Sequence, residues 1–317
     1  MEEKRVISAS RTRDLVRCAP GLLAQFLSGR RPVRFVRTPS LHTLRSGDIG
    51  ALALWTKDPA PLSTHTALRN ALSRYRIENG GAILLNLTVT GLGGTVLEPG
   101  IPTDDAVARS ARALIESGLL EAEAVILRYD PLIEVRTGSG VAGNIDVALF
   151  RRTVRRFSDL GVRRIKVSCA DYAYTHVARR LARYGIEPVI RSERELQSFI
   201  DEMLHVSREC GMRCDVCCNP ASGVTDTTAG CIDGSLINAL LERHGASWRV
   251  SERLHNDIGR QRPGCRCTWS TDIGYTPGIP SCFTTGGACL YCYSQRNMRY
   301  GMPGRMVEEE IPSGDAG

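Results

Sequence analysis

Cysteines near the C-terminal end offer the clearest chemistry in this sequence. Cys282, Cys289 and Cys292 are separated by six and then two residues, and Tyr293 directly follows the last one. Three thiolates with this spacing can fold over one face of a cuboidal cluster, and iron–sulfur clusters are normally held by cysteine thiolates. Three ligands on four irons leave one iron open to a small molecule. The spacing therefore favours a [4Fe–4S] cluster with one open coordination site.

Further cysteines precede this triplet, since ten of the 12 in the chain lie between Cys210 and Cys292. In a reducing compartment, clustered thiols serve as metal ligands or redox centres more often than as disulfides. Four of them are predicted to bind a second cluster or a zinc ion: Cys217, Cys231, Cys265 and Cys267. Which of the crowded cysteines at 210, 214, 217 and 218 acts as a ligand stays open, and a single structural zinc site of four cysteines is the alternative. Cys18 is remote in sequence from all of these and is predicted to be a minor packing thiol.

Charged and aromatic residues follow the short apolar runs of the first half of the chain. The predicted catalytic residues are Arg11, Asp14, Lys57, Arg128 and Asp130. The predicted cofactor-binding residues are Ser10, Trp55, Thr56, Tyr129 and Tyr293. Packing alone does not explain such a set, because apolar residues would serve a core better. If these runs are the strands of an α/β barrel, their C-terminal ends form a pocket for a polar or anionic ligand.

The elements that position these residues alternate between two periods. Predicted strands are short and rich in Val, Ile, Leu or Thr: Arg5–Ala9, Ala51–Thr56, Ala82–Val89, Ala124–Tyr129, Arg164–Cys169 and Gly211–Cys217. Between and after them, apolar residues recur three or four apart, which predicts amphipathic helices. Six βα units in series imply a parallel sheet with right-handed crossovers. The fold class is thus α/β, a (β/α)6-type partial TIM barrel, with an open doubly wound sheet as the alternative.

The composition changes at Trp248, after which Gly, Pro, Arg and Cys dominate and apolar periodicity is lost. We expect a barrel-like domain over residues 1–247 and a cysteine-rich, cluster-binding segment over 248–307. Something other than a hydrophobic core must order that segment. Residues 308–317 are expected to be a flexible tail.

Composition and charge exclude several classes of protein. With 42% hydrophobic and 24% charged residues, the chain is neither disordered nor coiled-coil. It has no apolar run long enough for a membrane span and no signal peptide, so a cytoplasmic location is expected. The net charge is +7, but only three of the 41 basic residues are lysine, which indicates a codon bias more than phosphate contacts. A nucleic-acid partner is permitted but not indicated.

Several motifs together resemble the bacterial DUF1848 family. They are ISASRTRD at 7–14, WTKDP at 55–59, LRYDPL at 127–132, CIDG at 231–234, QRPGCRC at 261–267, STDIGY at 270–275 and CLYCY at 289–293. The resemblance implies a C-terminal cysteine cluster similar to that of radical SAM proteins, and the CxYCY ending resembles the cluster loop of spore photoproduct lyases. Two features depart from these patterns. Six residues rather than three separate Cys282 from Cys289, and the cluster loop follows the barrel instead of its first strand.

Three functions compete on this basis. The first is a radical SAM-like enzyme, with S-adenosyl-L-methionine (SAM) on the open iron and a polar or anionic small molecule or peptide as substrate. Such an enzyme needs an electron donor such as ferredoxin or flavodoxin. The second is a zinc-stabilised binding protein for nucleic acid, in which the cysteines are structural. The third is an iron–sulfur enzyme that binds its substrate directly at the open iron without SAM.

Overall fold

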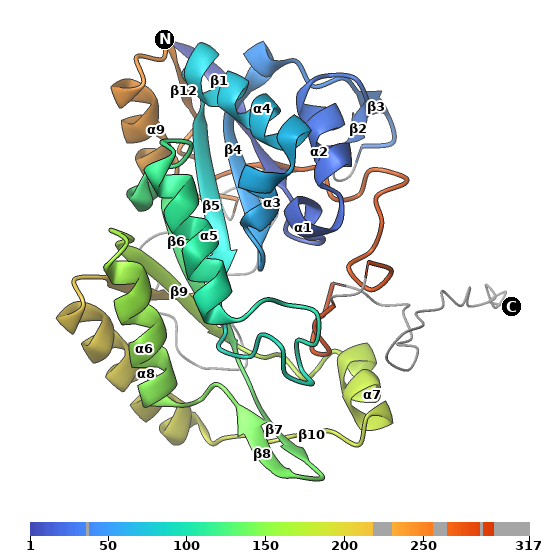
Figure 1. The fold of residues 1–317 in the computed structure, drawn as a ribbon, viewed down its shortest axis with the longest axis vertical. Coiled ribbons are helices and arrows are strands. Elements are labelled where there is room, and N and C mark those ends of the chain that lie inside the picture. Colours follow the sequence, from blue (N-terminus) through green and yellow to red (C-terminus); the bar gives the residue numbers. More distant parts are fainter. Residues whose placement is uncertain (36–37, 218–229, 256–264, 286–287, 295–317) are drawn as a thin grey trace, which may run out of the picture.

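The computed structural model describes residues 1–35, 38–217, 230–255, 265–285 and 288–294. Its centre is a parallel sheet with the strand order β11-β9-β6-β5-β4-β1-β12, and β13 also pairs with β1 (Figure 1). The strands are β1 (Glu2–Ala9), β4 (Ile49–Thr56), β5 (Ala82–Thr88), β6 (Val125–Leu132), β9 (Arg164–Cys169), β11 (Arg213–Val216), β12 (Trp248–Val250) and β13 (Thr271–Asp272). The six predicted strands are therefore confirmed, with ends that shift by up to three residues.

Strand order distinguishes between the two predicted architectures. From β1 through β4, β5, β6 and β9 to β11, neighbouring strands follow one another along the chain, which is the order of a barrel and not of a doubly wound sheet. Within the described residues, no pairing joins the end strands β11 and β12, so the sheet is open on that side. The chain is thus mixed α/β with a parallel central sheet.

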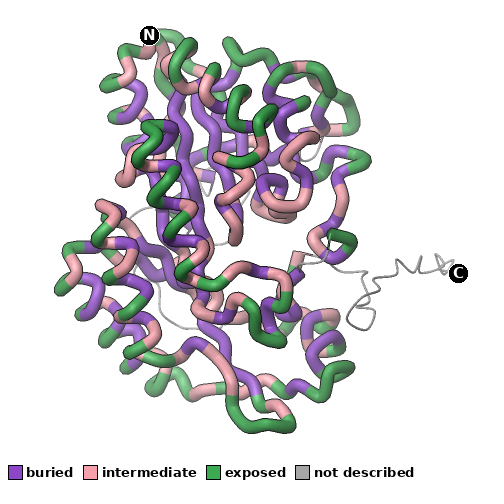
Figure 2. The backbone as a smooth tube through the Cα atoms, viewed as in Figure 1, coloured by how far each residue is buried: buried purple, intermediate pink, exposed green. Residues whose placement is uncertain are grey.

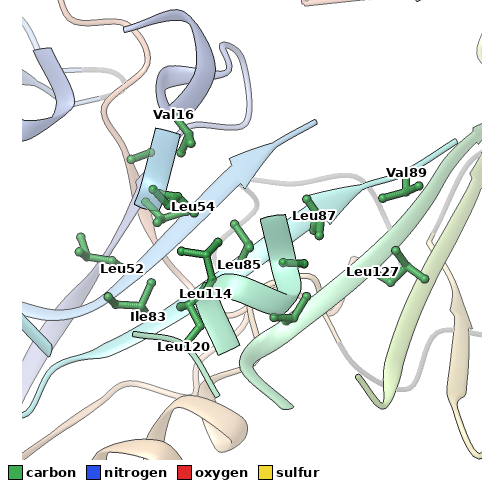
Figure 3. Close-up of a cluster of buried hydrophobic side chains, with 14 of the residues drawn as sticks. Val16, Leu52, Leu54, Ile83, Leu85, Leu87, Val89, Leu114, Leu120 and Leu127 are labelled. Atoms are coloured by element: carbon green, nitrogen blue, oxygen red, sulfur yellow. The ribbon is translucent and has the colours of Figure 1, made fainter. Parts of the chain in front are cut away.

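Helices cover the outer face of the sheet in a layer. They are α1 (Leu15–Cys18), α2 (Pro20–Leu27), α3 (Ala60–Thr64), α4 (Thr66–Ser73), α5 (Asp104–Glu116), α6 (Val147–Ser158) and α8 (Glu193–Glu209). Every second strand residue, such as Leu54, Leu85 and Leu127, packs against this layer (Figure 3). Because side chains alternate along a strand, the residues between them face the inside of the sheet.

The inner face is divided into an apolar half and a polar half. Towards the N-terminal ends of the strands, residues such as Ala53 and Leu84 are covered by α9 (Gly234–Arg243), whose Leu236, Ile237 and Leu240 are buried against them. Towards the C-terminal ends, the inward positions carry Ser8, Asn86 and Arg128, beyond the reach of that apolar cluster. Figure 2 shows the strands buried along most of their length. Helix α9 therefore plugs one end of the inner face and leaves the other end for polar groups.

The segment that begins at Trp248 contributes two short strands to the central sheet. Strand β12 pairs with Glu2–Lys4 of β1, and β13 pairs with Ile7 and Ser8 further along the same strand. Strands β12 and β13, together named here the interrupted strand, thus both extend the central sheet beside β1. Neither strand was predicted, because β12 and β13 have three and two residues, which is too short for a hydrophobic period to be recognised.

Smaller elements frame the C-terminal ends of the strands. Strands β7 (Glu134–Thr137), β8 (Gly140–Gly143) and β10 (Glu187–Pro188) form a second sheet, and α7 (Thr175–Arg183) packs beside it. The strands β2 (Val33–Arg34) and β3 (Leu41–His42) form an antiparallel pair. Short helical turns lie at η1 (Ser46–Asp48), η2 (Arg74–Glu78) and η3 (Ala122–Ala124). None of the described helices is long and apolar enough to cross a membrane. Residues 308–317 lie outside the described residues.

Candidate functional site

A cavity of about 300 Å³ opens at the C-terminal ends of the central strands. Its lining contains nine of the ten predicted catalytic and cofactor-binding residues: Ser10, Arg11, Asp14, Trp55, Thr56, Lys57, Arg128, Asp130 and Tyr293. It also contains all seven predicted metal ligands: Cys217, Cys231, Cys265, Cys267, Cys282, Cys289 and Cys292. Residues spread over nearly the whole chain thus face one space.

Tyr129 is the exception, because its side chain does not line the cavity. Its side chain is fully buried, stacks edge-on against Phe150 of the outer helix layer, and donates a hydrogen bond to the Asn144 carbonyl. The physical reason is strand alternation, because its neighbours Arg128 and Asp130 point into the cavity and Tyr129 must point to the opposite face.

Two arginines approach the ring of Trp55 from the cavity. The guanidinium carbon of Arg11 lies 5.4 Å and that of Arg128 lies 5.1 Å from the centre of the indole ring. The indole Nε1 donates to Ser8 Oγ at 3.1 Å, which fixes the orientation of the ring. Among the described residues, the buried Nη2 of Arg11 has no hydrogen-bond partner. A buried guanidinium nitrogen without a partner is suited to an anionic oxygen of a ligand.

Asp272 holds the loop that carries Arg11. Its Oδ2 accepts hydrogen bonds from Ser8 Oγ at 2.7 Å and from the Arg11 backbone N–H at 2.8 Å. Gly274 then passes so close that a Cβ there would lie 2.0 Å from Ser10 Oγ, so only glycine fits. The 270–275 motif thus positions the 7–14 motif across more than 250 residues of sequence.

Asp14 connects the first and second strand ends. Its carboxylate caps α1 by accepting from the Arg17 N–H at 3.0 Å, and it accepts from Thr56 Oγ1 and the Lys57 N–H, both at 2.9 Å. Burial raises the pKa of Asp14, although these hydrogen bonds oppose the shift. Because both carboxylate oxygens are engaged, Asp14 acts here as a tie between loops.

Lys57 belongs to a buried network behind the C-terminal cysteines. Its Nζ lies 2.9 Å from Glu98 Oε1 and 3.1 Å from Tyr291 Oη, and Glu98 also accepts from Thr90 Oγ1 at 2.7 Å. Burial opposes the charge of Lys57, but the carboxylate of Glu98 and the nearby Cys289 outweigh it and raise the pKa of the ammonium group. Lys57 therefore places a stable positive charge next to Cys289.

Arg128 and Asp130 form an ion pair on the opposite wall, and Ser168 donates to the other oxygen of Asp130. Burial disfavours the charge of Arg128, but neighbouring Cys231, Cys217, Tyr293 and Cys267 raise its pKa overall. The guanidinium of Arg128 thus remains charged among thiols.

The C-terminal cysteines Cys282, Cys289 and Cys292 are named here the loop thiols. The Cys292 N–H donates to the Cys289 carbonyl at 3.0 Å, which closes the turn between them. Burial raises the pKa of Cys289 and of Cys292, and the charges of the loop thiols add to each other's shifts. The three sulfurs are thus close enough for the charge of one to affect the pKa of the others. Bringing all three to the thiolate state there requires a compensating positive charge.

Helix α7 anchors the loop that carries these thiols (Figure 1). Arg180 Nη1 donates to the Leu290 carbonyl at 3.0 Å and to the Cys292 carbonyl at 2.8 Å. His176 Nε2 lies 2.8 Å from the Tyr293 carbonyl, and the Tyr293 ring stacks on Tyr174 with ring centres 5.5 Å apart. Tyr293, predicted to bind a cofactor, thus lies at the cavity rim with one face against α7.

Cys18 is far from the C-terminal cysteines in the sequence, but in the folded chain it lies beside Cys282. It shares a hydrogen bond with Cys282, which raises the pKa of Cys282 and lowers that of Cys18. The Asp14 N–H also approaches Cys282 Sγ at 3.4 Å. The sequence did contain a sign of this position. Residues four apart share one face of a helix, and Cys18 lies four residues after the predicted site residue Asp14.

Cys217, Cys231, Cys265 and Cys267 are named here the inner thiols. Cys231, Cys265 and Cys267 form a buried cluster of their own, with Cys217 and Trp55 packed against it. Cys218 lies outside the described residues, whereas Cys210 and Cys214 pack against the main core away from the cavity. Within the described residues, no three His, Cys, Asp or Glu side chains are grouped as ligands of a single metal ion.

Other residues of the site carried weaker signals in the sequence. Glu98, Tyr291, Asp272 and Arg180 all bond to site groups but follow no strand end directly. Tyr291 and Asp272 lie inside two of the motifs, whereas Arg180 lies in α7, whose other arginines, Arg179 and Arg183, are exposed. Only their partners in the folded chain distinguish them.

The sequence matches the family model described as "Domain of unknown function (DUF1848)" over residues 6–294. The chain therefore belongs to this family, as the motifs predicted. No curated protein matches it.

Among solved structures, the chain is similar to D-hydantoinase from a Bacillus sp. AR9, with 11% identity and a TM-score of 0.27. That match covers 64% of this chain and 39% of the hydantoinase, so the chain spans about two fifths of that protein. The catalytic domain of a mannanase from Streptomyces sp. SirexAA-E matches with 14% identity and a TM-score of 0.30, over 78% of this chain and 74% of the other. A triazine hydrolase from Arthobacter aurescens matches with 12% identity and a TM-score of 0.31, over 85% and 73%. Scores this low carry no argument about the chemistry of this chain.

Proposed function

We propose that this DUF1848 protein is an iron–sulfur enzyme of the radical SAM type, acting on a small polar or anionic substrate in the cavity at the strand ends. The observation that carries the proposal is the meeting in one cavity of the three loop thiols with Arg11, whose buried Nη2 has no hydrogen-bond partner among the described residues. One group could hold a cluster, and the other could hold an anion next to it.

The loop thiols suit a [4Fe–4S] cluster in their chemistry. Thiolates are the usual ligands of such clusters, and three of them leave one iron without a protein ligand. Burial disfavours the thiolate form of Cys289 and Cys292 in the protein alone, so a cationic cluster would supply the missing charge. When bound, the cluster would provide the single electron that reductive cleavage of SAM requires.

Lys57 and Arg180 would prepare the loop for this cluster. The carboxylate of Glu98 keeps Lys57 charged beside Cys289. Arg180 donates hydrogen bonds to two backbone carbonyls of the loop. Both contacts reduce the freedom of the loop before any ligand binds. Such preorganisation lowers the entropic cost of binding.

Arg11 would bind a carboxylate of the ligand. Its Nη2 is buried without a partner among the described residues, and Trp55 supports the guanidinium plane. The Asp272 carboxylate holds the Arg11 backbone, so the side chain starts from a fixed position. A planar guanidinium binds a carboxylate with two parallel hydrogen bonds, which gives both strength and orientation.

Arg128, Asp130 and Ser168 would contact the substrate from the other wall. Arg128 is charged, and Asp130 accepts from both of its neighbours, so this wall offers a donor and an acceptor side by side. The cavity volume of about 300 Å³ lies at the lower end of small-molecule sites, which favours a small substrate. Electrons would come from a protein of the ferredoxin or flavodoxin class.

The test begins with anaerobic purification and analysis of iron and acid-labile sulfide. The protein is then reduced with dithionite in the presence of SAM, and 5′-deoxyadenosine is measured by chromatography. We expect brown protein and 5′-deoxyadenosine that disappears in Cys289→Ser. Cys210→Ser is the matched control, because Cys210 lies at the end of α8 outside the cavity lining.

Two other outcomes separate the alternatives. Iron and sulfide without any SAM binding would favour an enzyme that takes its substrate directly at the open iron. Stoichiometric zinc without iron would overturn both iron–sulfur functions and favour a zinc-stabilised protein. A nucleic-acid partner has little support here, because Arg11 and Arg128 line a cavity instead of an exposed basic surface.

A further inference from the structure

The inner thiols come from three separate parts of the chain. Cys217 follows β11, Cys231 precedes α9, and Cys265 and Cys267 lie in the interruption between β12 and β13. Cys231, Cys265 and Cys267 are 5%, 7% and 6% exposed, and all four inner thiols line the cavity. The fold therefore brings four cysteine sulfurs to one cavity, although the cysteines lie in separate segments of the sequence.

Packing alone gives a poor account of this convergence. The other buried clusters of the protein consist mainly of Leu, Ile, Val and Ala, as cores normally do. The cluster of inner thiols has only cysteines at its centre, with Trp55 against it. Three or four thiols fill space less effectively than branched aliphatic side chains, so a core would not select them together.

Hydrogen-bond donors point at two of these sulfurs. Arg128 Nη1 approaches Cys231 Sγ at 2.7 Å, and the Cys231 N–H approaches Cys267 Sγ at 3.2 Å. Donors directed at sulfur stabilise its negative charge and tune bound clusters. The backbones of the segments that carry Cys231 and Cys267 also approach closely, since a Cβ on Gly230 would lie 2.4 Å from the Cα of Cys267. Only glycine lets the two cysteine-bearing segments approach in this way.

We propose that Cys217, Cys231, Cys265 and Cys267 hold a second [4Fe–4S] cluster, closed by four protein thiolates, on the wall of the cavity that Arg128 occupies. It is distinct from the centre proposed for the loop thiols. The two sets share no residue, and they meet different cations, Lys57 for one and Arg128 for the other.

A cluster fits better than a zinc ion. A tetrahedral zinc ion draws four sulfurs to within about 2.3 Å of one point. In the described residues, no three of these side chains are grouped around a single ion, although all four face the same space. A cuboidal cluster sets its ligands further apart because each sulfur binds a different iron.

Arg128 would set the reduction potential of this second cluster. A charged donor next to a cluster sulfur favours the reduced, more negative state, since potentials depend on net charge and on hydrogen bonds to sulfur. The second site does not require that the protein cleave SAM. It rests on the proposed function only in that both centres hold iron.

The test compares metal content in matched variants of the full chain. We expect about eight irons per chain in the anaerobic wild-type protein, as two four-iron clusters require. Cys289→Ser should retain about half of this iron, and Cys265→Ser combined with Cys267→Ser should lose the other half. Arg128→Gln should lower the midpoint potential of the centre that survives in Cys289→Ser, which a purely structural arginine would not do.

The outcomes separate this proposal from the proposed function. About four irons that vanish entirely in Cys289→Ser would overturn the second cluster while leaving the first intact. Zinc at about one ion per chain, lost in the double variant, would also overturn it. Iron at about eight per chain without 5′-deoxyadenosine would support the second cluster and count against SAM chemistry. Because the wild-type count and Cys289→Ser decide the matter, the proposal stays testable even if the double variant fails to fold.

Discussion

The loop thiols and the inner thiols face the same cavity, but the chain brings them there in different ways. The loop thiols lie within eleven consecutive residues, and their anchors are a buried network around Lys57 and the carbonyl contacts of Arg180. The inner thiols span from Cys217 to Cys267 and meet because β11, α9 and the interrupted strand converge. Three ligands suit a centre that must bind another molecule, and four suit one that stays closed. The comparison therefore predicts two sites with different coordination on one sheet.

The largest expected effect comes from breaking the loop thiols alone. Cys292→Ser should reduce formation of 5′-deoxyadenosine by about 10³-fold or more, because the cofactor carries the difficult chemistry. The melting temperature should change little, since the main core contains none of the loop thiols. Iron analysis, chromatography and thermal denaturation measure this. A variant that loses its iron and keeps full activity would contradict the assignment of the loop thiols.

A smaller effect is expected from Arg11, which lines the same cavity as both thiol groups. Arg11→Met should weaken SAM binding about 10- to 100-fold, because hydrogen bonds to charged groups contribute about 1.5–3 kcal/mol. Arg11→Lys should restore only part of it, since lysine cannot form the two parallel bonds. Isothermal titration on anaerobic protein measures the dissociation constant.

Arg183→Met serves as the matched control for Arg11→Met, because it removes a positive charge at an exposed position at the end of α7. Equal loss of affinity in the Arg11 and Arg183 variants would point to a general charge effect and not to a specific contact.

Cys18 offers a milder way to sharpen the comparison. It touches Cys282 but belongs to neither proposed ligand set, so Cys18→Ser should leave the iron content unchanged. In protein stripped of iron, diamide should join Cys18 to Cys282 as a disulfide, because the two sulfurs are already in contact. Peptide mass spectrometry detects the link. Loss of iron in Cys18→Ser would instead make Cys18 a ligand and close the proposed open site.

The smallest effect concerns Cys169, which lines the cavity outside both thiol groups. Burial raises the pKa of Cys169 to about 11, so the neutral thiol persists until the pH approaches that value. At pH 8 its thiolate fraction is about 200-fold below that of an ordinary cysteine with a pKa of about 8.5. Alkylation by iodoacetamide, followed by mass spectrometry, should therefore be slow at pH 8 and should accelerate steadily towards pH 11. Fast labelling at pH 7 would contradict this.

The strand ends illustrate what a sequence can predict of such a site. The strands with near-continuous apolar residues were predictable, because a sheet covered on both faces needs them. Once the strands are known, residues such as Arg11, Lys57 and Arg128 must gather at their C-terminal ends. Tyr129 does not follow this rule, because a position near the end of a strand does not determine which face of the sheet the side chain points to. Only the alternation from Arg128 to Asp130 decides that it points to the helices.

By itself, the sequence determined the family, the order of the main strands, and the grouping of the loop thiols. These depend on local motifs, on the hydrophobic period and on the spacing of the cysteines. The tertiary structure alone decided the contact of Cys18 with Cys282, the interrupted strand after Trp248, and the use of α9 to cover the inner face. It also brought Arg128 against Cys231. These contacts join residues far apart in the chain, and their free energy comes from burial and charge pairing that exist only when the chain is folded. No periodic pattern along the sequence encodes them.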